Sequence, residues 1–238
     1  MKIFAIIQAR MGSTRLPGKV LLDLAGEPVL ARVVQRSSRA ATLDEVIVAT
    51  TTKAEDQPII DLCIEHGWRY HRGSEFDLLD RYYQTVCKEP PDIVARITSD
   101  CPLIDPEIID RVVGEFLADG ALDYAGECCY PVGLSIEVMT FAALERAWLE
   151  DRNPLWREHV TPYIYRHPEL FRVRRIRNDE DLSGFRWTLD TPEDFKLISR
   201  IYDHFGHDRF SWKEALVLAM AHPEWTAINA NVNQKTID

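Results

Sequence analysis

The sequence predicts an α/β fold in which helices flank a mostly parallel central sheet, followed by an irregular, inserted C-terminal third. Apolar segments alternate with amphipathic ones at the spacing of β-α-β units. Residues 2–8 form a near-continuous apolar run, which is typical of a strand that is covered on both faces. The chain has 238 residues, of which 46% are hydrophobic, and this is enough to bury a large core.

In the first half, strand patterns and helix patterns follow one another closely. We expect, in chain order, strand 2–8, helix 28–40, strand 45–50, helix 57–66, helix 76–88, strand 92–98 and helix 105–117. Gly67 is expected to end the helix before it. Asp105, Pro106 and Glu107 predict a helix start, because they supply an N-cap, a proline at the first helical position and an acidic first turn.

After residue 122 the pattern is less regular. We expect, in order, strand 136–139, helix 141–149, a segment of undecided type at 160–166, strand 185–189 and helix 212–221. The strand at 185–189 alternates apolar and polar residues, so one of its faces should be partly wet. Thr191 and Asp194 predict a capping box that opens a helix ending at Gly206.

The charge of the chain is unevenly distributed. The net charge is −10, yet the first 40 residues carry seven bases against two acids, a net +5, which leaves −15 for the rest. Binding of nucleic acid without sequence preference depends on clustered bases, so we expect no nucleic-acid partner. A local basic segment in an acidic protein instead indicates a small anionic ligand.

The sequence contains no candidate membrane span. The longest apolar run near the start, 3–7, is too short for a span or a signal sequence, so we expect no membrane association and a cytoplasmic location. The five cysteines show no CxxC spacing and are expected to be reduced, buried thiols.

The segment after the first strand, from Gln8 to Lys19, is the first candidate site. Strand-to-helix loops of this kind bind phosphates in α/β proteins. The segment is not a Walker A motif, because five residues separate Gly12 from Gly18 and Val20 replaces the Ser or Thr, and it lacks G-x-G-x-x-G. It brings together three cations, which suit a triphosphate: Arg10, Arg15 and Lys19. A solvated surface loop, the alternative, leaves that clustering unexplained.

The run IIQARMGSTRLPGKVL resembles the opening signature of the cytidylyltransferases that activate acidic sugars, the 3-deoxy-manno-octulosonate and acylneuraminate enzymes. It is most similar to the spore-coat polysaccharide biosynthesis protein F branch. The resemblance covers about residues 2–206 and implies a Rossmann-like nucleotide-diphospho-sugar transferase fold. It also implies that Arg10, Arg15 and Lys19 contact the triphosphate of CTP. Further nucleotide contacts are implied at Gln8, Ala9, Gly12 and Ser13.

On this basis the chain is one nucleotidyltransferase domain, 1–238. We expect a nucleotide-binding half at 1–120, an acceptor-binding half at 121–206 and a C-terminal helical tail at 207–238.

Two aspartates are candidate ligands of Mg²⁺. Asp100 follows a buried strand, where a carboxylate among cations holds Mg²⁺ or else forms a turn. Asp190 precedes the capping box and is not needed for it, so its carboxylate is free to bind a metal. The alternative is a loop aspartate that only makes a hydrogen bond within its own turn. The resemblance implies that both bind the metal, in blocks that read G-D-x-P-L and V-D-T-P-E-D in the family. Here Ser99 and Cys101 depart from the usual residues beside Asp100, and we assign Cys101 no chemical role.

The resemblance also implies contacts to the base, at Arg72 and Ser74. In the same segment Asp77 and Asp80 are expected to act as acidic residues at a helix start. Arg81 is expected to pair with Asp77 at i,i+4 spacing.

The acceptor pocket is implied at Glu137, His159 and Tyr163. Ser135 stands where the family commonly has Asp, which affects the identity of the acceptor. A lone histidine is more often packed or solvated than a ligand, so the assignment of His159 depends on the resemblance.

The resemblance and these residues predict a Mg²⁺-dependent enzyme that transfers CMP from CTP to an acidic sugar, or to a related phosphate or phosphonate acceptor, with release of pyrophosphate, in surface polysaccharide or glycoconjugate biosynthesis. The apolar, Trp-rich segment 144–165 suggests a homodimer. Three alternatives remain: a nucleotidyltransferase that uses another nucleoside triphosphate on a sugar phosphate, a glycosyltransferase, and a non-catalytic nucleotide-binding module. A glycosyltransferase would need a D-x-D pair to hold its metal, and no such pair follows an expected strand.

Overall fold

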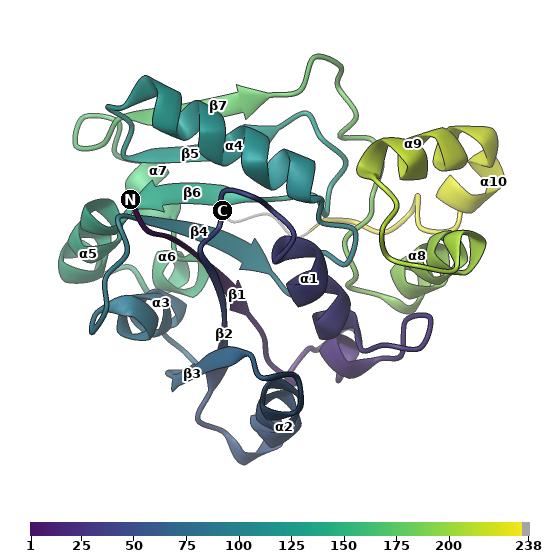
Figure 1. Cartoon of the computed structure of the whole chain (residues 1–238), viewed down its shortest axis with the longest axis horizontal. Coiled ribbons are helices and arrows are strands. Elements are labelled where there is room, and N and C mark those ends of the chain that lie inside the picture. Colours follow the sequence, from purple (N-terminus) through teal and green to yellow (C-terminus); the bar gives the residue numbers. More distant parts are fainter. Residues whose placement is uncertain (235–238) are drawn as a thin grey trace.

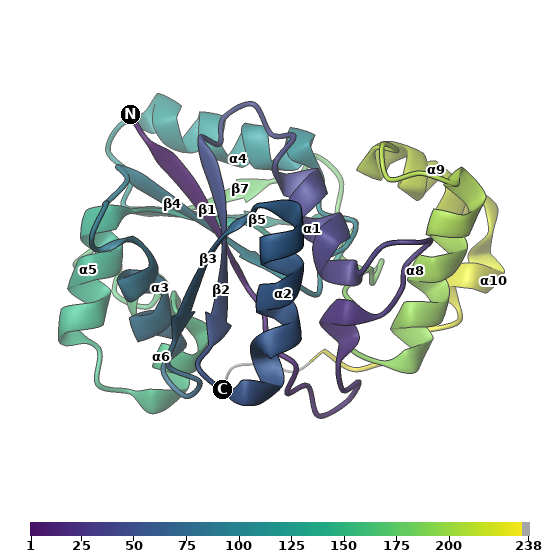
Figure 2. The ribbon, with the colours of Figure 1, turned by 60° about the horizontal axis from the view of Figure 1, so that its bottom comes forward.

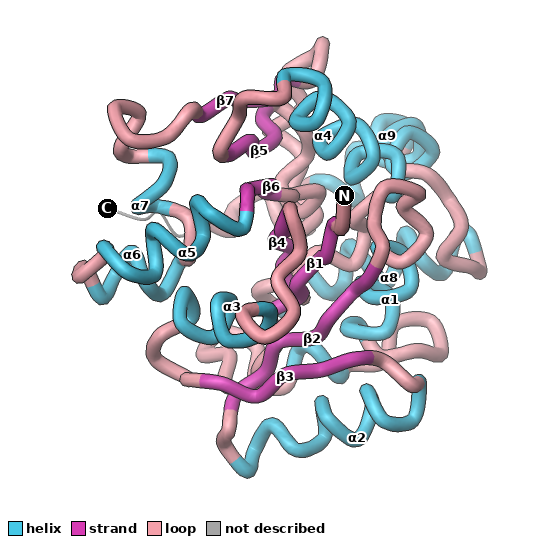
Figure 3. Tube along the Cα trace, turned by 60° about the vertical axis from the view of Figure 1, so that its left-hand side comes forward, coloured by secondary structure: helices cyan, strands magenta, loops and turns pink. Residues whose placement is uncertain are grey.

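The computed structural model describes residues 1–234, and in this part of the chain seven strands form one sheet. They are β1 (Ile3–Gln8), β2 (Glu45–Thr51), β3 (Arg69–Gly73), β4 (Ile93–Thr98), β5 (Tyr124–Cys128), β6 (Glu137–Thr140) and β7 (Val173–Arg177). Their order across the sheet is β3-β2-β1-β4-β6-β5-β7 (Figure 3). Only β6 runs antiparallel to its neighbours among these strands, so the prediction of a mostly parallel sheet is confirmed.

Helices cover both faces of the sheet (Figures 1 and 2). One face packs against α1 (Val29–Ser37), α2 (Gln57–His66) and α4 (Pro106–Asp119), with α8 (Pro192–Phe205) and α9 (Trp212–Ala221) extending the same core. The other face packs against α3 (Leu78–Val86), α5 (Phe141–Glu150) and α7 (Pro162–Tyr165). The remaining short helices are α6 (Pro154–His159), α10 (Pro223–Thr226), η1 (Lys19–Leu21) and η2 (Ala54–Asp56).

The position of β1 between two layers of helices explains its apolar sequence. Ile3, Ala5 and Ile7 belong to the core cluster on the α1 face, whereas Phe4 and Ile6 belong to the cluster on the α3 face. Successive side chains of a strand point to opposite faces, so a strand between two helix layers must be apolar throughout. The carboxyl ends of β1 and β4 pair in register, Gln8 beside Thr98, and this edge of the sheet positions the candidate site.

The predicted helix ends are confirmed. Gly67 ends α2 in the left-handed conformation with φ 68°, and the Asp105 side chain accepts the backbone N–H of Glu107 at the start of α4. Thr191 and Asp194 form a complete capping box at the start of α8, which ends at Gly206. The strand predicted at 136–139 is β6, and the undecided segment at 160–166 contains α7.

The strand predicted at 185–189 is wrong. This segment forms a single isolated bridge, between Val132 and Arg186, within the part of the chain that is described. The N–H of Trp187 donates to the carbonyl of Val132 at 2.6 Å, and that of Leu189 to the carbonyl of Asp100 at 2.8 Å. The segment is bonded to two loops instead of a neighbouring strand, and those bonds place Asp190 beside the end of β4.

Three strands lack a clear signal in the sequence. β3 reads Arg-Tyr-His-Arg-Gly, β5 contains Gly126 and Glu127, and β7 reads Val-Arg-Arg-Ile-Arg, so none of them has an apolar run. β7 lies at the edge of the sheet, where three exposed arginines are tolerated because one face is open to water.

The cysteines and helices add two observations. All five cysteines are free; Cys63 and Cys101 are buried as expected, but Cys87, Cys128 and Cys129 are partly exposed. Burial was therefore a wrong expectation for three of them. Among residues 1–234, no helix is both long and apolar enough to cross a bilayer.

Candidate active site

The loop between β1 and η1 is fixed by backbone hydrogen bonds. The N–H of Met11 donates to Oδ1 of Asp56 at 2.6 Å, and the N–H of Gly18 donates to the carbonyl of Met11 at 3.1 Å. Gly18 has φ 68°, in the left-handed region that favours glycine. This turn places Lys19 at the first position of η1, where the residue is only 9% exposed.

Lys19 joins two distant parts of the chain. Its Nζ lies 2.9 Å from Oδ2 of Asp100, 2.9 Å from Oδ1 of Asp190 and 2.8 Å from the carbonyl of Leu189. Burial alone would lower the pKa of Lys19, but the attraction of the two carboxylates outweighs it and the pKa is raised. Burial likewise opposes ionisation of Asp100, yet the charge of Lys19 holds the pKa of Asp100 below its usual value. The predicted convergence of these three residues is therefore present.

Asp190 is surrounded by cations. Nη2 of Arg15 lies 2.8 Å from its Oδ2, and Nη2 of Arg186 lies 3.1 Å from the same oxygen. Arg186 is held in turn by Asp194, through Nε at 2.9 Å and Nη2 at 3.0 Å. The loop that carries Arg15 and Lys19 therefore lies against the segment leading into α8 (Figure 2).

Arg10 is separated from this cluster. Its side chain is 45% exposed, and Nη2 lies 4.0 Å from Oε1 of Glu158 on α6. Two of the three predicted triphosphate cations, Arg15 and Lys19, are thus gathered at the aspartates, while Arg10 faces the helix on the other side. An exposed ion pair of this length contributes little stability, so Arg10 is free to take another anion.

The other nucleotide-binding candidates lie along the same loop. Oε1 of Gln8 accepts the hydroxyl of Tyr82 at 2.8 Å, which fixes the Gln8 side chain at the end of β1. Ala9 is buried, Gly12 is exposed and Ser13 is half-buried. Their contact with a nucleotide stays a prediction.

Arg72 and Ser74 make contacts within the protein. Arg72 donates from Nε to the carbonyl of Thr51 and from Nη2 to the carbonyl of Lys53, both at 3.0 Å. Oγ of Ser74 accepts the N–H of Asp77 at 3.1 Å. These bonds order the loops after β2 and β3, and a role at the base stays a prediction.

The expected pair between Asp77 and Arg81 is wrong. Asp77 is the N-cap of α3 and accepts the N–H of Asp80 at 2.8 Å, as an acidic residue at a helix start should. Its other oxygen binds Nε of Arg157 on α6 at 2.8 Å. Arg81 instead donates to the carbonyl of Ala49 on β2 and to the carbonyl of Glu75, which follows β3. Its side chain packs against Gly73, where an added Cβ would lie 2.8 Å from it.

The three acceptor candidates are in different surroundings. Glu137 forms an ion pair with Arg96 and accepts the Thr161 hydroxyl at 2.7 Å. His159 ends α6 and is half-buried. Tyr163 donates to Glu150 at 2.8 Å and packs against the His167 ring, 4.4 Å away. Within residues 1–234, Tyr163 has no hydrogen bond, ion pair or ring contact with the cluster around Lys19.

The donor set at Asp100 and Asp190 fits one kind of metal site. Two carboxylate oxygens lie 2.9 Å from the same nitrogen, and Mg²⁺ commonly takes one or two carboxylates plus phosphate oxygens. Among the described residues, no group of three or more His, Cys, Asp or Glu side chains is placed to hold a metal. The site therefore fits magnesium held jointly with a nucleotide's phosphates and does not fit a metal held by protein alone.

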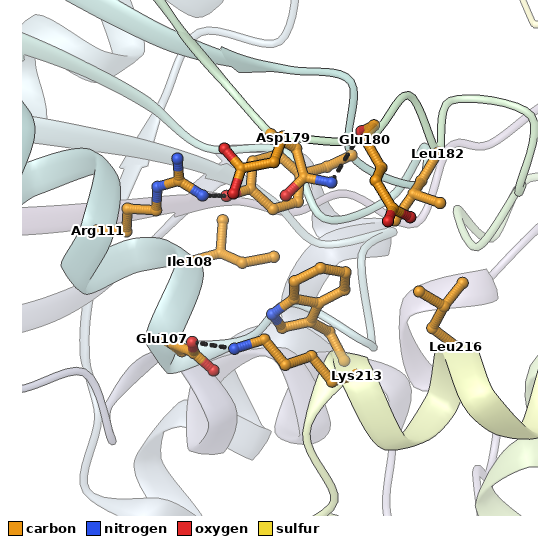
Figure 4. A pocket seen from close by; sticks show the side chains of 11 residues that line it. Glu107, Ile108, Arg111, Asp179, Glu180, Leu182, Lys213 and Leu216 are labelled. Carbon is orange, nitrogen blue, oxygen red and sulfur yellow. Dashed lines mark hydrogen bonds and ion pairs between the residues drawn. The ribbon is translucent and has the colours of Figure 1, made fainter.

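A separate cavity of about 270 Å³ lies between α4, α9 and the loop after β7 (Figure 4). Ile108, Leu182 and Leu216 give it apolar walls, and the ion pair of Glu107 with Lys213 lies at its rim. No residue predicted for the site lines this cavity.

Two charged residues of the site region are not among the predicted site residues. Arg186 lies four residues before Asp190, and that i,i+4 spacing was a usable signal. Arg96 lies inside the otherwise apolar β4, and a single charge in a buried strand is a signal of the same kind.

The seven-stranded sheet flanked by helices is the Rossmann-like fold that solved nucleotidyltransferases share. The chain belongs to the cytidylyltransferase family, whose model matches residues 4–216. A solved cytidylyltransferase from Leptospira borgpetersenii is 32% identical and superposes with a TM-score of 0.91, covering 99% of this chain and 100% of its own.

Curated relatives agree with this family. An uncharacterized protein of Methanocaldococcus jannaschii, MJ1063, is 43% identical over 99% of this chain and 98% of its own length. The spore coat polysaccharide biosynthesis protein SpsF of Bacillus subtilis is 35% identical over 93% and 95%, respectively. A 3-deoxy-manno-octulosonate cytidylyltransferase of Anaeromyxobacter dehalogenans is 31% identical over 87% and 92%. The predicted resemblance to the acidic-sugar enzymes and the protein F branch is confirmed.

Proposed function

We propose that this protein transfers CMP from CTP to an acidic sugar, or to a related phosphate or phosphonate acceptor, and releases pyrophosphate. The observation that carries the proposal is the position of Lys19 between Asp100 and Asp190, with Arg15 on the outer side of Asp190. Cations for a triphosphate and carboxylates for its metal thus share one edge of the sheet. The relationship to SpsF supports a role in surface polysaccharide or glycoconjugate biosynthesis.

In the proposed reaction an oxygen of the acceptor attacks the α-phosphorus in line. The bond from phosphorus to the bridging oxygen breaks, and pyrophosphate leaves with the bonding electrons. Arg10, Arg15 and Lys19 stabilise the negative charge that develops on the leaving group. Mg²⁺ at Asp100 and Asp190 would supply further positive charge to the phosphate oxygens. A phosphate or phosphonate acceptor attacks as its anion and releases no proton, whereas the proton of a sugar hydroxyl passes to solvent water, because no described side chain is assigned as general base.

Other parts of the proposal come from the sequence. Nucleotide contacts at Gln8, Ala9, Gly12, Ser13, Arg72 and Ser74, and acceptor contacts at Glu137, His159 and Tyr163, stay predictions. So do Mg²⁺ as cofactor, a homodimer through segment 144–165 and a cytoplasmic location.

The test is a nucleotide and acceptor screen. The protein is incubated with Mg²⁺, one of CTP, UTP, GTP or ATP, and 3-deoxy-manno-octulosonate, N-acetylneuraminate or a phosphorylated acceptor. Mass spectrometry then detects the conjugate, and a coupled assay detects pyrophosphate. We expect a CMP conjugate from CTP with at least one acceptor. Products from UTP or GTP alone would contradict the choice of nucleotide, and calorimetric binding of CTP without turnover would favour a non-catalytic module.

A further inference from the structure

Arg96 is an unusual residue for its position. It lies on β4, in register with Ile6 of β1 on one side and Glu137 of β6 on the other. Its neighbours Ala95 and Ile97 are fully buried, yet its side chain keeps 15% exposure. A permanently charged group thus reaches solvent from the middle of the sheet.

The guanidinium of Arg96 is only partly satisfied. Nη1 binds Glu137, whereas Nε is buried and has no hydrogen-bond partner. Within residues 1–234, Nη2 also makes no hydrogen bond. A buried donor without a partner costs about 1–3 kcal/mol, and such groups are rare in native proteins. An anionic oxygen from a ligand would satisfy the unused side of this fork.

Glu137, in contrast, is already engaged. Its carboxylate accepts the hydroxyls of Tyr124 and Thr161 in addition to Arg96. Burial would raise the pKa of Glu137, but Arg96 outweighs burial and holds the pKa below its usual value. Glu137 therefore fixes the orientation of Arg96 and has little capacity left for a ligand, which argues against the direct acceptor contact predicted for Glu137.

The groups around Arg96 leave its charge available. Burial lowers the pKa of His159 and outweighs the opposing attraction of Glu158, and the charge of Arg96 acts in the same direction as burial. Thr98, the last residue of β4, points to the same side of the strand as Arg96, and Asp100 lies two residues beyond the end of the strand. An acceptor beside Asp100 would extend back over this part of the sheet.

We infer that Arg96 binds the anionic group of the acceptor, a carboxylate or a phosphoryl group, and that Glu137 is the positioning residue that holds it. The inference rests on the proposed function and adds the residue that selects charged acceptors.

The experiment compares three variants with the wild-type protein. Arg96→Lys keeps the charge and the ion pair but loses the planar fork. The double variant Arg96→Gln with Glu137→Gln removes both charges, so that no carboxylate is left unpaired. Arg174→Gln, at an exposed arginine of β7 paired with Asp119, is the matched control. Thermal unfolding establishes that each variant is folded; should the double variant fail to fold, Arg96→Lys still carries the test.

Calorimetry measures binding in the presence of CTP and EDTA, so that no transfer occurs. The probes are 3-deoxy-manno-octulosonate and N-acetylneuraminate for carboxylates, glucose 1-phosphate for a phosphoryl group, and N-acetylmannosamine as an uncharged sugar. We expect at least one anionic probe to bind the wild type more tightly than the uncharged sugar. A charged hydrogen-bonded pair lost at Arg96 should weaken that binding roughly 10- to 100-fold. Affinity for CTP, and all binding by the Arg174 control, should stay the same.

Three results would overturn the inference: unchanged affinity for the anionic probe in Arg96→Lys and the double variant, equal binding of the uncharged sugar, or no anionic probe that binds the wild type. Pyrophosphate release separates this from the proposed function. If the wild type transfers CMP and Arg96→Lys keeps the wild-type KM for the acceptor, the function stands and the role of Arg96 is wrong. If the probes bind through Arg96 but no nucleotide is ever transferred, the function is wrong and the binding role stands.

Discussion

The ammonium nitrogen of Lys19 lies 2.9 Å from Oδ1 of Asp190, although 171 positions separate the two residues in the chain. This contact belongs to a cluster in which three cations balance three carboxylates, made up of Arg15, Lys19, Arg186, Asp100, Asp190 and Asp194. The cluster is therefore electrically neutral without a ligand. Under the proposed function, Asp100 and Asp190 would exchange Lys19 for the metal, and Arg15 and Lys19 would exchange the carboxylates for phosphate oxygens.

Replacing Lys19 tests the triphosphate contact. By analogy with the loss of one donor from a site that stabilises transition-state charge, Lys19→Ala should cost on the order of 3 kcal/mol, about a hundredfold in turnover. Steady-state pyrophosphate release gives kcat and KM for CTP. Lys53→Ala is the control, because Lys53 pairs with Glu55 and Glu75 at the surface. Equal activity of the two variants would remove Lys19 from the mechanism.

Replacing Asp100 tests the metal site. Asp100→Asn keeps the size of the side chain and removes one of the two carboxylates, so we expect the fold to be unchanged and the Mg²⁺ concentration for half-maximal activity to rise. The measurement is turnover over a Mg²⁺ titration, with circular dichroism as the check of folding. Asp119→Asn, at an exposed residue, serves for comparison. Full turnover by Asp100→Asn at low Mg²⁺ would show that the metal assignment is wrong.

Glu127 should make stability depend on pH. Burial, together with the charge of Glu137, raises the pKa of Glu127 to about 8. The folded protein therefore holds this proton more tightly than the unfolded chain, whose pKa is near the ordinary value. The stabilisation is complete below about pH 4.5 and is lost as the pH rises toward 8.

Glu127→Gln removes this titration, so the Tm of the variant minus that of the wild type should increase between about pH 5 and pH 8.5. Calorimetric scans at several pH values measure the difference. A difference that is the same at both ends of this range would mean that Glu127 ionises normally.

Gly133 should be indispensable for the segment that carries Asp190. It has φ 107°, and an added Cβ would lie 2.4 Å from the backbone of Trp187 and of Thr188. Gly133→Ala should therefore lower stability by about 2 kcal/mol or more, as measured by urea unfolding. Gly114→Ala is the matched comparison: it lies within α4 with nothing within 4 Å of the new Cβ, and it should stabilise the helix slightly. If the two alanine variants were equally stable, the close approach at Gly133 would be refuted.

Much of the fold was predictable because it depends on local patterns. β1 and β4 are largely apolar because helices cover both faces of the sheet, and the capping box at Thr191 marks the start of α8. The approach of Lys19 to Asp100 was predictable for a related reason: both follow strands whose carboxyl ends meet at one edge of the sheet.

The rest depends on contacts that local patterns do not encode. The alternation at 185–189 indicates an extended chain, but whether it pairs with a strand depends on loops far away in sequence, here Val132 and Asp100. In the same way, the i,i+4 spacing favoured Arg81 as the partner of Asp77, but tertiary packing places Arg157 beside it. Neither the partial satisfaction of Arg96 nor the full engagement of Glu137 follows from their neighbours in the sequence.

The bond between Lys19 and Asp190 also has a consequence for biosynthesis of the protein. Three oxygens bind Lys19, and two of them belong to Leu189 and Asp190, which follow the last strand in the chain. Lys19 therefore lacks these two partners until the ribosome has added residue 190. The basic loop thus acquires its final environment late in translation, and a prematurely terminated chain that ends before residue 190 lacks one of the two carboxylates that bind Lys19.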